Sequence, residues 1–250
     1  MFRSDMPRVY ELQDLIADRS APEAYFQSFD ISVRDEPEKM KSWRARERAF
    51  QRLDPAAWVF LKGEAQRYLT KPNSSGRGYQ QLISMLNQAW AYNYLVDIGC
   101  QRLAFIPSGT SNGQETPDLK GEVDGRRVLC EVKTIGVSDE EAARRKSHGA
   151  GSTVSTLAPG FFNKLTCTLL KAGSQMKSYD SAVGIKRIAF VAIDFDDFLG
   201  EYKEDYYAQI DGHLAANPVS DMEVVFFNSR TAFHRPIIMR YAQVIHEPAG

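Results

Sequence analysis

Two carboxylates and a lysine, Asp118, Glu131 and Lys133, lie on either side of an Asp124-Gly125 pair. An Asp-Gly pair between two strand-like segments is among the strongest short-range signals for a two-residue hairpin turn. Such a turn would place Asp118 opposite Glu131 on one face of the hairpin, where Cβ atoms are roughly 4.5–5.5 Å apart. Two carboxylates this close repel, so one has a raised pKa or a cation lies between them. Their oxygens suit Mg²⁺, which binds one or two carboxylates together with waters and substrate phosphate oxygens.

The turn also predicts the register of the whole hairpin. Val123 would face Arg126, Glu122 would face Arg127, and Lys120 would face Leu129, unless a bulge shifts the pairing by one residue. Side chains alternate between faces with period two. The predicted apolar face carries Leu119, Val123, Val128, Cys130 and Val132. The predicted polar face carries Asp118, Lys120, Glu122, Arg127, Glu131 and Lys133, with Leu129 as its one apolar residue. The alternative is a surface hairpin with ordinary charges, which the interior-like strand disfavours because such strands normally exclude charge.

Pro117-Asp118, the hairpin and Glu131-Val132-Lys133 resemble the signature of the PD-(D/E)xK nuclease superfamily. The resemblance implies that Asp118 and Glu131 hold one or two Mg²⁺ ions, for which Mn²⁺ should substitute. It also implies that the backbone carbonyl of Val132 is a further ligand and that Lys133 orients or activates the attacking water.

A second motif, Gln175-x-x-x-Tyr179, resembles one that follows Glu-x-Lys in the RecB-like branch of this superfamily. There it lies beside the active site and the nucleic-acid backbone, so Gln175 and Tyr179 are further candidates for the catalytic site. Many relatives also place a Glu on the helix before the first strand. The corresponding segment here has no acid, and its residues off the apolar stripe include Gln81, Ser84 and Gln88. Glu64, on the preceding helix, is the alternative third carboxylate, and it can equally be an ordinary solvated charge.

Basic residues near these motifs are candidates for contacts with nucleic-acid phosphates. Residues 136–160 form a long polar stretch, and so long an irregular segment within a domain is usually functional or disordered. On the helix predicted over residues 160–180, a polar line runs beside the apolar stripe. The candidates are Arg144, Arg145, Lys146, Lys164 and Lys171.

Composition restricts the remaining possibilities. The net charge of −1 means that any nucleic-acid contact must come from local basic patches. The three cysteines lie in apolar segments and are expected to be reduced, which indicates a cytoplasmic protein. No apolar signal region and no run of about 18 apolar residues is present, so no membrane association is expected. The four histidines lack zinc-ligand spacing.

The pattern of elements predicts an α/β fold: a restriction-endonuclease-like mixed β-sheet flanked by helices, with a helical N-terminal extension. Residues 1–72 read as helical, a Gly- and Ser-containing loop follows, and residues 76–250 form the nuclease-like domain. Within that domain, helices are predicted at 79–97 and 160–180, and strands at 102–107, 187–195, 222–228 and 235–245. The strand-helix-strand order over 187–228 predicts a right-handed parallel crossover.

These observations predict that the protein is a Mg²⁺-dependent nuclease that hydrolyses phosphodiester bonds, with DNA as the expected substrate. Two alternatives stay open: a catalytically inactive nucleic-acid-binding module of the same fold, and an interaction or structural protein in which the motif is accidental. A metal titration separates them. Oligomeric state is not indicated by the sequence.

Overall fold

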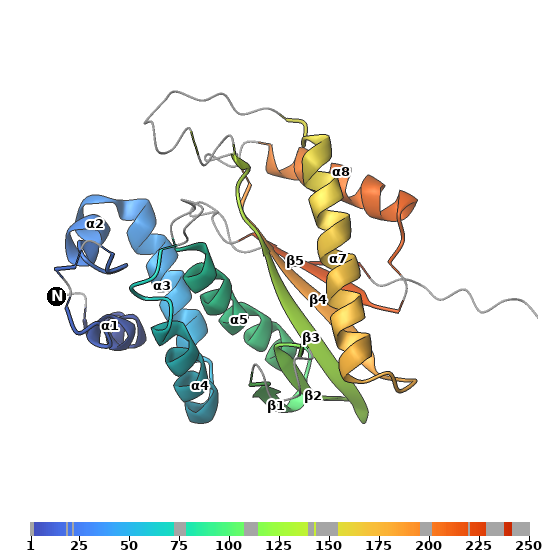
Figure 1. Ribbon diagram of the computed structural model, residues 1–250, viewed down its shortest axis with the longest axis horizontal. Helices are drawn as coiled ribbons and strands as arrows, with labels where there is room; N and C mark the ends of the chain where they lie inside the picture. The colour runs from blue at the N-terminus through green and yellow to red at the C-terminus, as the bar shows by residue number, and fades with distance from the viewer. Residues whose placement is uncertain are drawn as a thin grey trace, which may run out of the picture.

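The chain is an α/β protein in which helices precede and flank a mixed β-sheet, as seen in a computed structural model (Figure 1). The structure describes residues 3–18, 20–21, 23–72, 79–107, 115–139, 143, 155–195, 202–219, 221–228 and 238–241. The helices are α1 (Pro7–Asp14), α2 (Phe29–Asp35), α3 (Pro37–Gln51), α4 (Pro55–Gln66), α5 (Gln80–Asp97), α7 (Pro159–Tyr179) and α8 (Lys203–Ala216). The strands are β1 (Gln101–Phe105), β2 (Leu119–Val123), β3 (Arg126–Ile135), β4 (Lys186–Ile193), β5 (Glu223–Asn228) and β6 (Ile238–Tyr241).

The sheet has the strand order β1-β2-β3-β4-β5-β6. Strands β1, β2 and β3 pair antiparallel, β3, β4 and β5 pair parallel, and β6 is antiparallel to β5. The predicted parallel pairing of the two apolar strands around a helix is therefore confirmed, with α8 as the connecting helix. A long hydrophobic strand such as β4 belongs at this position because helices cover both faces of a parallel sheet.

The hairpin has the predicted register. Val123 pairs with Arg126, Glu122 with Arg127, and Lys120 with Leu129. Asp124 and Gly125 have φ angles of 50° and 73°, and two consecutive positive φ values are what a two-residue type I′ turn requires. No bulge shifts the pairing of β2 with β3, so the local turn chemistry alone was sufficient to predict the alignment.

Two hydrophobic layers lie on opposite faces of the sheet. Helix α5 and the N-terminal helices cover one face, and α7 and α8 cover the other (Figure 1). The predicted apolar face of the hairpin, including Leu119, Val128 and Cys130, belongs to the layer on the α5 side. The opposite face is not uniformly polar, because Leu129 is buried beneath α7. The stripe of α7 that covers it contains Leu165, Leu169, Ala172 and Met176, as its helical spacing predicted.

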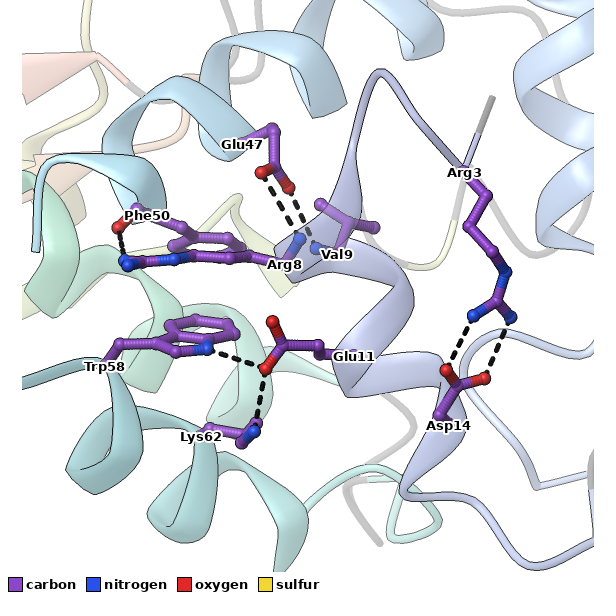
Figure 2. Close-up of polar contacts among 9 residues, drawn as sticks. All are labelled: Arg3, Arg8, Val9, Glu11, Asp14, Glu47, Phe50, Trp58 and Lys62. Carbon is purple, nitrogen blue, oxygen red and sulfur yellow. Dashed lines mark hydrogen bonds and ion pairs between the residues drawn. The ribbon is translucent and has the colours of Figure 1, made fainter. Parts of the chain in front are cut away.

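The N-terminal helices are joined by buried polar contacts as well as by apolar packing (Figure 2). Glu47 on α3 is 1% exposed and accepts hydrogen bonds from the backbone N–H groups of Arg8 and Val9, at 3.2 Å and 2.9 Å. In return, the Arg8 guanidinium donates to the carbonyls of Phe50 and Leu53 at the end of α3. Glu47 thereby pairs N–H groups in the first turn of α1 that an isolated helix leaves unpaired, and Arg8 adds hydrogen bonds to carbonyls at and just after the end of α3.

Helices α3 and α4 also contact α5 and the sheet. The ring of Phe60 stacks on Phe105 of β1 with centroids 5.2 Å apart, and Asp54 accepts a 2.6 Å hydrogen bond from the Tyr92 hydroxyl. One hydrophobic cluster runs from the N-terminal helices through α5 to the sheet. The loop that was predicted to separate residues 1–72 from residues 76–250 lies largely outside the described residues, at 73–78.

Within the described part of the chain, no helix combines the length and the apolar character that crossing a membrane requires.

Candidate active site

The hairpin places Asp118 and Glu131 side by side at the point where β2 begins. Regular pairing ends at Leu119 and Cys130, so the two acids occupy the next position along the strands. Each Asp118 carboxylate oxygen accepts a hydrogen bond. Gln88 of α5 donates its Nε2 to Oδ1 at 2.7 Å, and the Val132 backbone N–H donates to Oδ2 at 2.7 Å.

Glu131 points to the α7 face of the sheet and is 3% exposed. One of its carboxylate oxygens accepts a hydrogen bond from the Lys133 ammonium. The other accepts from Gln175 Nε2 at 3.0 Å, and Gln175 Oε1 accepts from Lys133 at 3.1 Å. Glu131, Lys133 and Gln175 thus form a closed triangle of hydrogen bonds, and Gln175 also donates to the carbonyl of Thr116 at 2.6 Å. The structure therefore brings Gln175, a candidate from its sequence motif, into contact with both Glu131 and Lys133.

Burial controls the charge of this pair. Loss of solvation raises the pKa of Asp118 to about 6, although the Val132 N–H and the Lys133 ammonium act in the opposite direction. Loss of solvation and the neighbouring charge of Asp118 raise the pKa of Glu131 to about 8, against the attraction of Lys133. Without a cation, the pair therefore retains a proton near neutral pH. This is the behaviour expected of two carboxyl groups that share a poorly hydrated site.

The backbone adds an oxygen to this group. The N–H and C=O groups of a strand residue point to the same edge of the strand. Because the Val132 N–H points toward Asp118, the Val132 carbonyl faces the same edge, past the end of β2. Two carboxylates and a carbonyl are hard oxygen donors that fit a Mg²⁺ ion, with waters supplying the remaining ligands.

A third acid does not join the pair in the part of the chain that the structure describes. No group of three or more His, Cys, Asp or Glu side chains among these residues is arranged to hold a metal ion. Glu64 forms an ion pair at 2.9 Å with Arg67, the residue that directly follows the end of α4. In place of an acid, α5 presents the amide of Gln88 to Asp118.

Three other predicted site residues, Lys164, Lys171 and Tyr179, lie on α7 and are not members of this triangle. Tyr179 is the last residue of α7, and its half-buried ring packs at the edge of the hydrophobic layer. Lys171 is exposed on α7 and forms a 3.1 Å ion pair with Glu115, three residues before Asp118. Lys164 is exposed on the first half of α7. The predicted contacts of Arg144, Arg145 and Lys146 lie outside the described residues.

Two neighbouring contacts were not anticipated from the sequence. Asn87, which is fully buried, donates to the Thr134 hydroxyl at 3.2 Å and accepts from Arg46 at 3.3 Å. The hydrogen bond between Gln88 and Asp118 was likewise not predicted. The available signal was the pair Asn87-Gln88 itself, because two buried amides within an apolar helix need polar partners.

Comparison of the chain with protein-family models, with curated proteins and with solved structures finds no match.

Proposed function

We propose that this protein is a Mg²⁺-dependent nuclease of the PD-(D/E)xK superfamily, with the restriction-endonuclease-like form of the α/β fold, acting on DNA. The observation that carries the proposal is the pair of adjacent carboxylates, half-buried Asp118 and buried Glu131, with Lys133 hydrogen-bonded to Glu131. Burying two acids together is unfavourable unless a cation or a proton compensates their charge. Carboxyl groups with strongly raised pKa values cluster at functional sites.

Asp118, Glu131 and the Val132 carbonyl would hold the ion. Bound Mg²⁺ supplies charge neutralisation at the phosphate and activation of the attacking water. Lys133 places an ammonium group beside Glu131, where it can hold a water or a phosphate oxygen by hydrogen bonding. Gln175 fixes the orientation of both Lys133 and Glu131, and Gln88 fixes that of Asp118. Supporting hydrogen bonds of this kind typically contribute 10- to 100-fold to metal affinity or activity.

The second candidate function is a nucleic-acid-binding module of the same fold that does not cut. One observation favours it: each oxygen of both carboxylates already accepts a hydrogen bond from the protein. A cation must therefore share or displace these donors. Metal binding distinguishes the two candidates, because only the nuclease needs a tight site.

The test is a cleavage assay on single-stranded, duplex and branched DNA, and on RNA, with Mg²⁺, with Mn²⁺ and in excess chelator. Replacing Asp118 with Asn or Glu131 with Gln should reduce cleavage about a thousandfold or more. This follows because metal catalysis contributes several kcal/mol and each 1.36 kcal/mol corresponds to a factor of ten in rate. The same variants should melt no lower than the wild type without metal, since each removes one of two repelling groups.

Glu122→Gln is the matched control, because it makes the same chemical change on β2 at a residue that pairs with Arg102 instead. Its activity should equal that of the wild type. Full activity of Asp118→Asn, or cleavage that persists in chelator, would overturn the nuclease proposal. Nucleic-acid binding with neither tight Mg²⁺ binding nor cleavage of any substrate would favour the binding module.

A further inference from the structure

On the face of the sheet where α7 packs, the helix covers β3, whereas the neighbouring strand β2 has a solvent-exposed residue, Lys120. Helix α7 packs against β3 and β4, whereas β1 and β2 extend beyond it (Figure 1). The burial of paired residues shows the same boundary: Leu129 on β3 is 4% exposed, and its partner Lys120 on β2 is exposed. Asp118 and Glu131 lie at this boundary. Among the described residues, the exposed face of β1 and β2 therefore borders the two acids on the α7 side.

Charges on and around this open face are mostly paired. Glu122 forms an ion pair with Arg102 at 3.1 Å, Arg127 pairs with Asp180, and Lys171 pairs with Glu115. Lys120 differs from them, because it has no ion-pair partner within the described residues. Its cross-strand neighbours, Leu129 and Ala104, offer no anionic group.

The position of Lys120 relative to the candidate metal site follows from strand geometry. Lys120 is two residues after Asp118, and alternate residues of a strand point to the same face. Their Cα atoms are therefore roughly 6.5–7 Å apart along β2. Lysine is a compact point charge on a flexible stem, which suits contact with a phosphate without selection for a base.

We propose that Lys120 binds a backbone phosphate adjacent to the one held at Asp118 and Glu131, so that the nucleic-acid strand reaches the site across β1 and β2. This inference rests on the proposed function and adds to it the path of the substrate and a residue that positions it. Contact with the backbone alone implies that binding is sensitive to salt and indifferent to sequence.

The experiment measures the affinity of the full-length chain for fluorescent single-stranded DNA, and for RNA of the same sequence, in chelator at several salt concentrations. Lys120→Ala should weaken binding about five- to tenfold at low salt, since losing a phosphate contact removes roughly 1 kcal/mol. The slope of log affinity against log salt should fall by about 0.7, the value for one phosphate of a single strand. Lys120→Arg should retain most of the affinity.

Arg126→Ala is the matched control. Arg126 is also exposed and cationic, lies in the same hairpin, and belongs to the opposite face of the sheet. Its removal should leave the affinity and the salt slope unchanged. Equal effects of Lys120→Ala and Arg126→Ala, with a wild type that binds, would overturn the inference and leave the proposed function intact. A wild type that neither binds nor cleaves either nucleic acid would overturn both.

Discussion

Asp118 and Glu131 couple the site to pH. Free carboxyl groups have pKa values near 4, whereas burial raises these two to about 6 and about 8. From about pH 4 up to about pH 8, the folded, metal-free protein therefore binds more protons than the unfolded chain does. The stabilisation that this provides is fully present below about pH 4 and is lost as the pH rises through the two folded-state values.

A melting series from pH 5 to pH 9 in chelator measures this effect. Between about pH 6 and pH 8 the wild type should lose stability relative to Glu131→Gln, which has no group that titrates at that position. Added Mg²⁺ competes with the protons, so its affinity should rise over the same range, with protons released on binding. Parallel melting curves for the two proteins at all pH values would contradict the raised pKa of Glu131.

At the candidate metal site, the residue of α5 that faces Asp118 is Gln88 and not a third acid, so its replacement tests the proposed number of cations. The amide N–H of Gln88 donates a hydrogen bond to Asp118. A carboxylate in place of this amide would instead supply a further oxygen ligand for a cation. We expect calorimetric titration of the wild type with Mn²⁺ to show one tight site. Gln88→Glu should bind a second ion, because affinity for such cations increases with ligand charge. Without metal it should melt lower, owing to a third buried acid.

Gln81→Glu is the control for this change, since Gln81 is exposed on the same helix. It should bind Mn²⁺ as the wild type does. Two tight sites in the wild type would contradict the one-cation prediction.

At the scale of elements, Glu47 determines how α1 is attached to α3 (Figure 2). It accepts from two N–H groups in the first turn of α1, while being almost fully buried. Glu47→Ala should lower the free energy of unfolding by about 2–4 kcal/mol. A buried donor left unpaired costs roughly 1–3 kcal/mol, and the Arg8 N–H, which is only partly buried, should cost less than the buried Val9 N–H. Denaturant unfolding with a constant m value provides the measurement.

A surface ion pair between the last residue of α1 and the turn before this helix gives the comparison. Arg3 and Asp14 form a bidentate pair, and their side chains are 56% and 43% exposed. Asp14→Ala should cost less than about 1 kcal/mol, as is usual for exposed pairs. Equal losses for the two variants would show that Glu47 has no special role in joining the helices.

At the scale of the whole molecule, one hydrophobic cluster joins the N-terminal helices, α5 and the sheet. Asn93 of α5 donates to the carbonyl of Ala49 at 3.0 Å, and Phe60 stacks on β1. Removing residues 1–78 would expose this apolar surface and leave such groups without partners. We therefore expect residues 79–250 alone to be insoluble or to lack a cooperative melting transition. A truncated chain that melts cooperatively and still binds Mn²⁺ would show that the N-terminal helices are a separable extension.

The hairpin at the centre of the candidate site could be predicted from sequence because its determinants are local. A two-residue turn with positive φ angles sets the register, and the period of two then assigns each side chain to a face. The same holds for the apolar stripe of α7 and for the buried strands β4 and β5. In each case the pattern lies within the segment whose structure it specifies.

Other features depended on the packing of segments that are distant along the chain. Sequence did not indicate that Gln88 meets Asp118, that Lys171 pairs with Glu115, or that α7 covers Leu129 and leaves Lys120 open. Polar and charged side chains can form hydrogen bonds and ion pairs with many different partners, so the residue type does not specify which partner is used. The raised pKa values of Asp118 and Glu131 have the same origin. The sequence by itself placed two acids opposite each other. Only the tertiary structure decided their charge, because the packing of α5 and α7 around them buries Glu131 and half-buries Asp118.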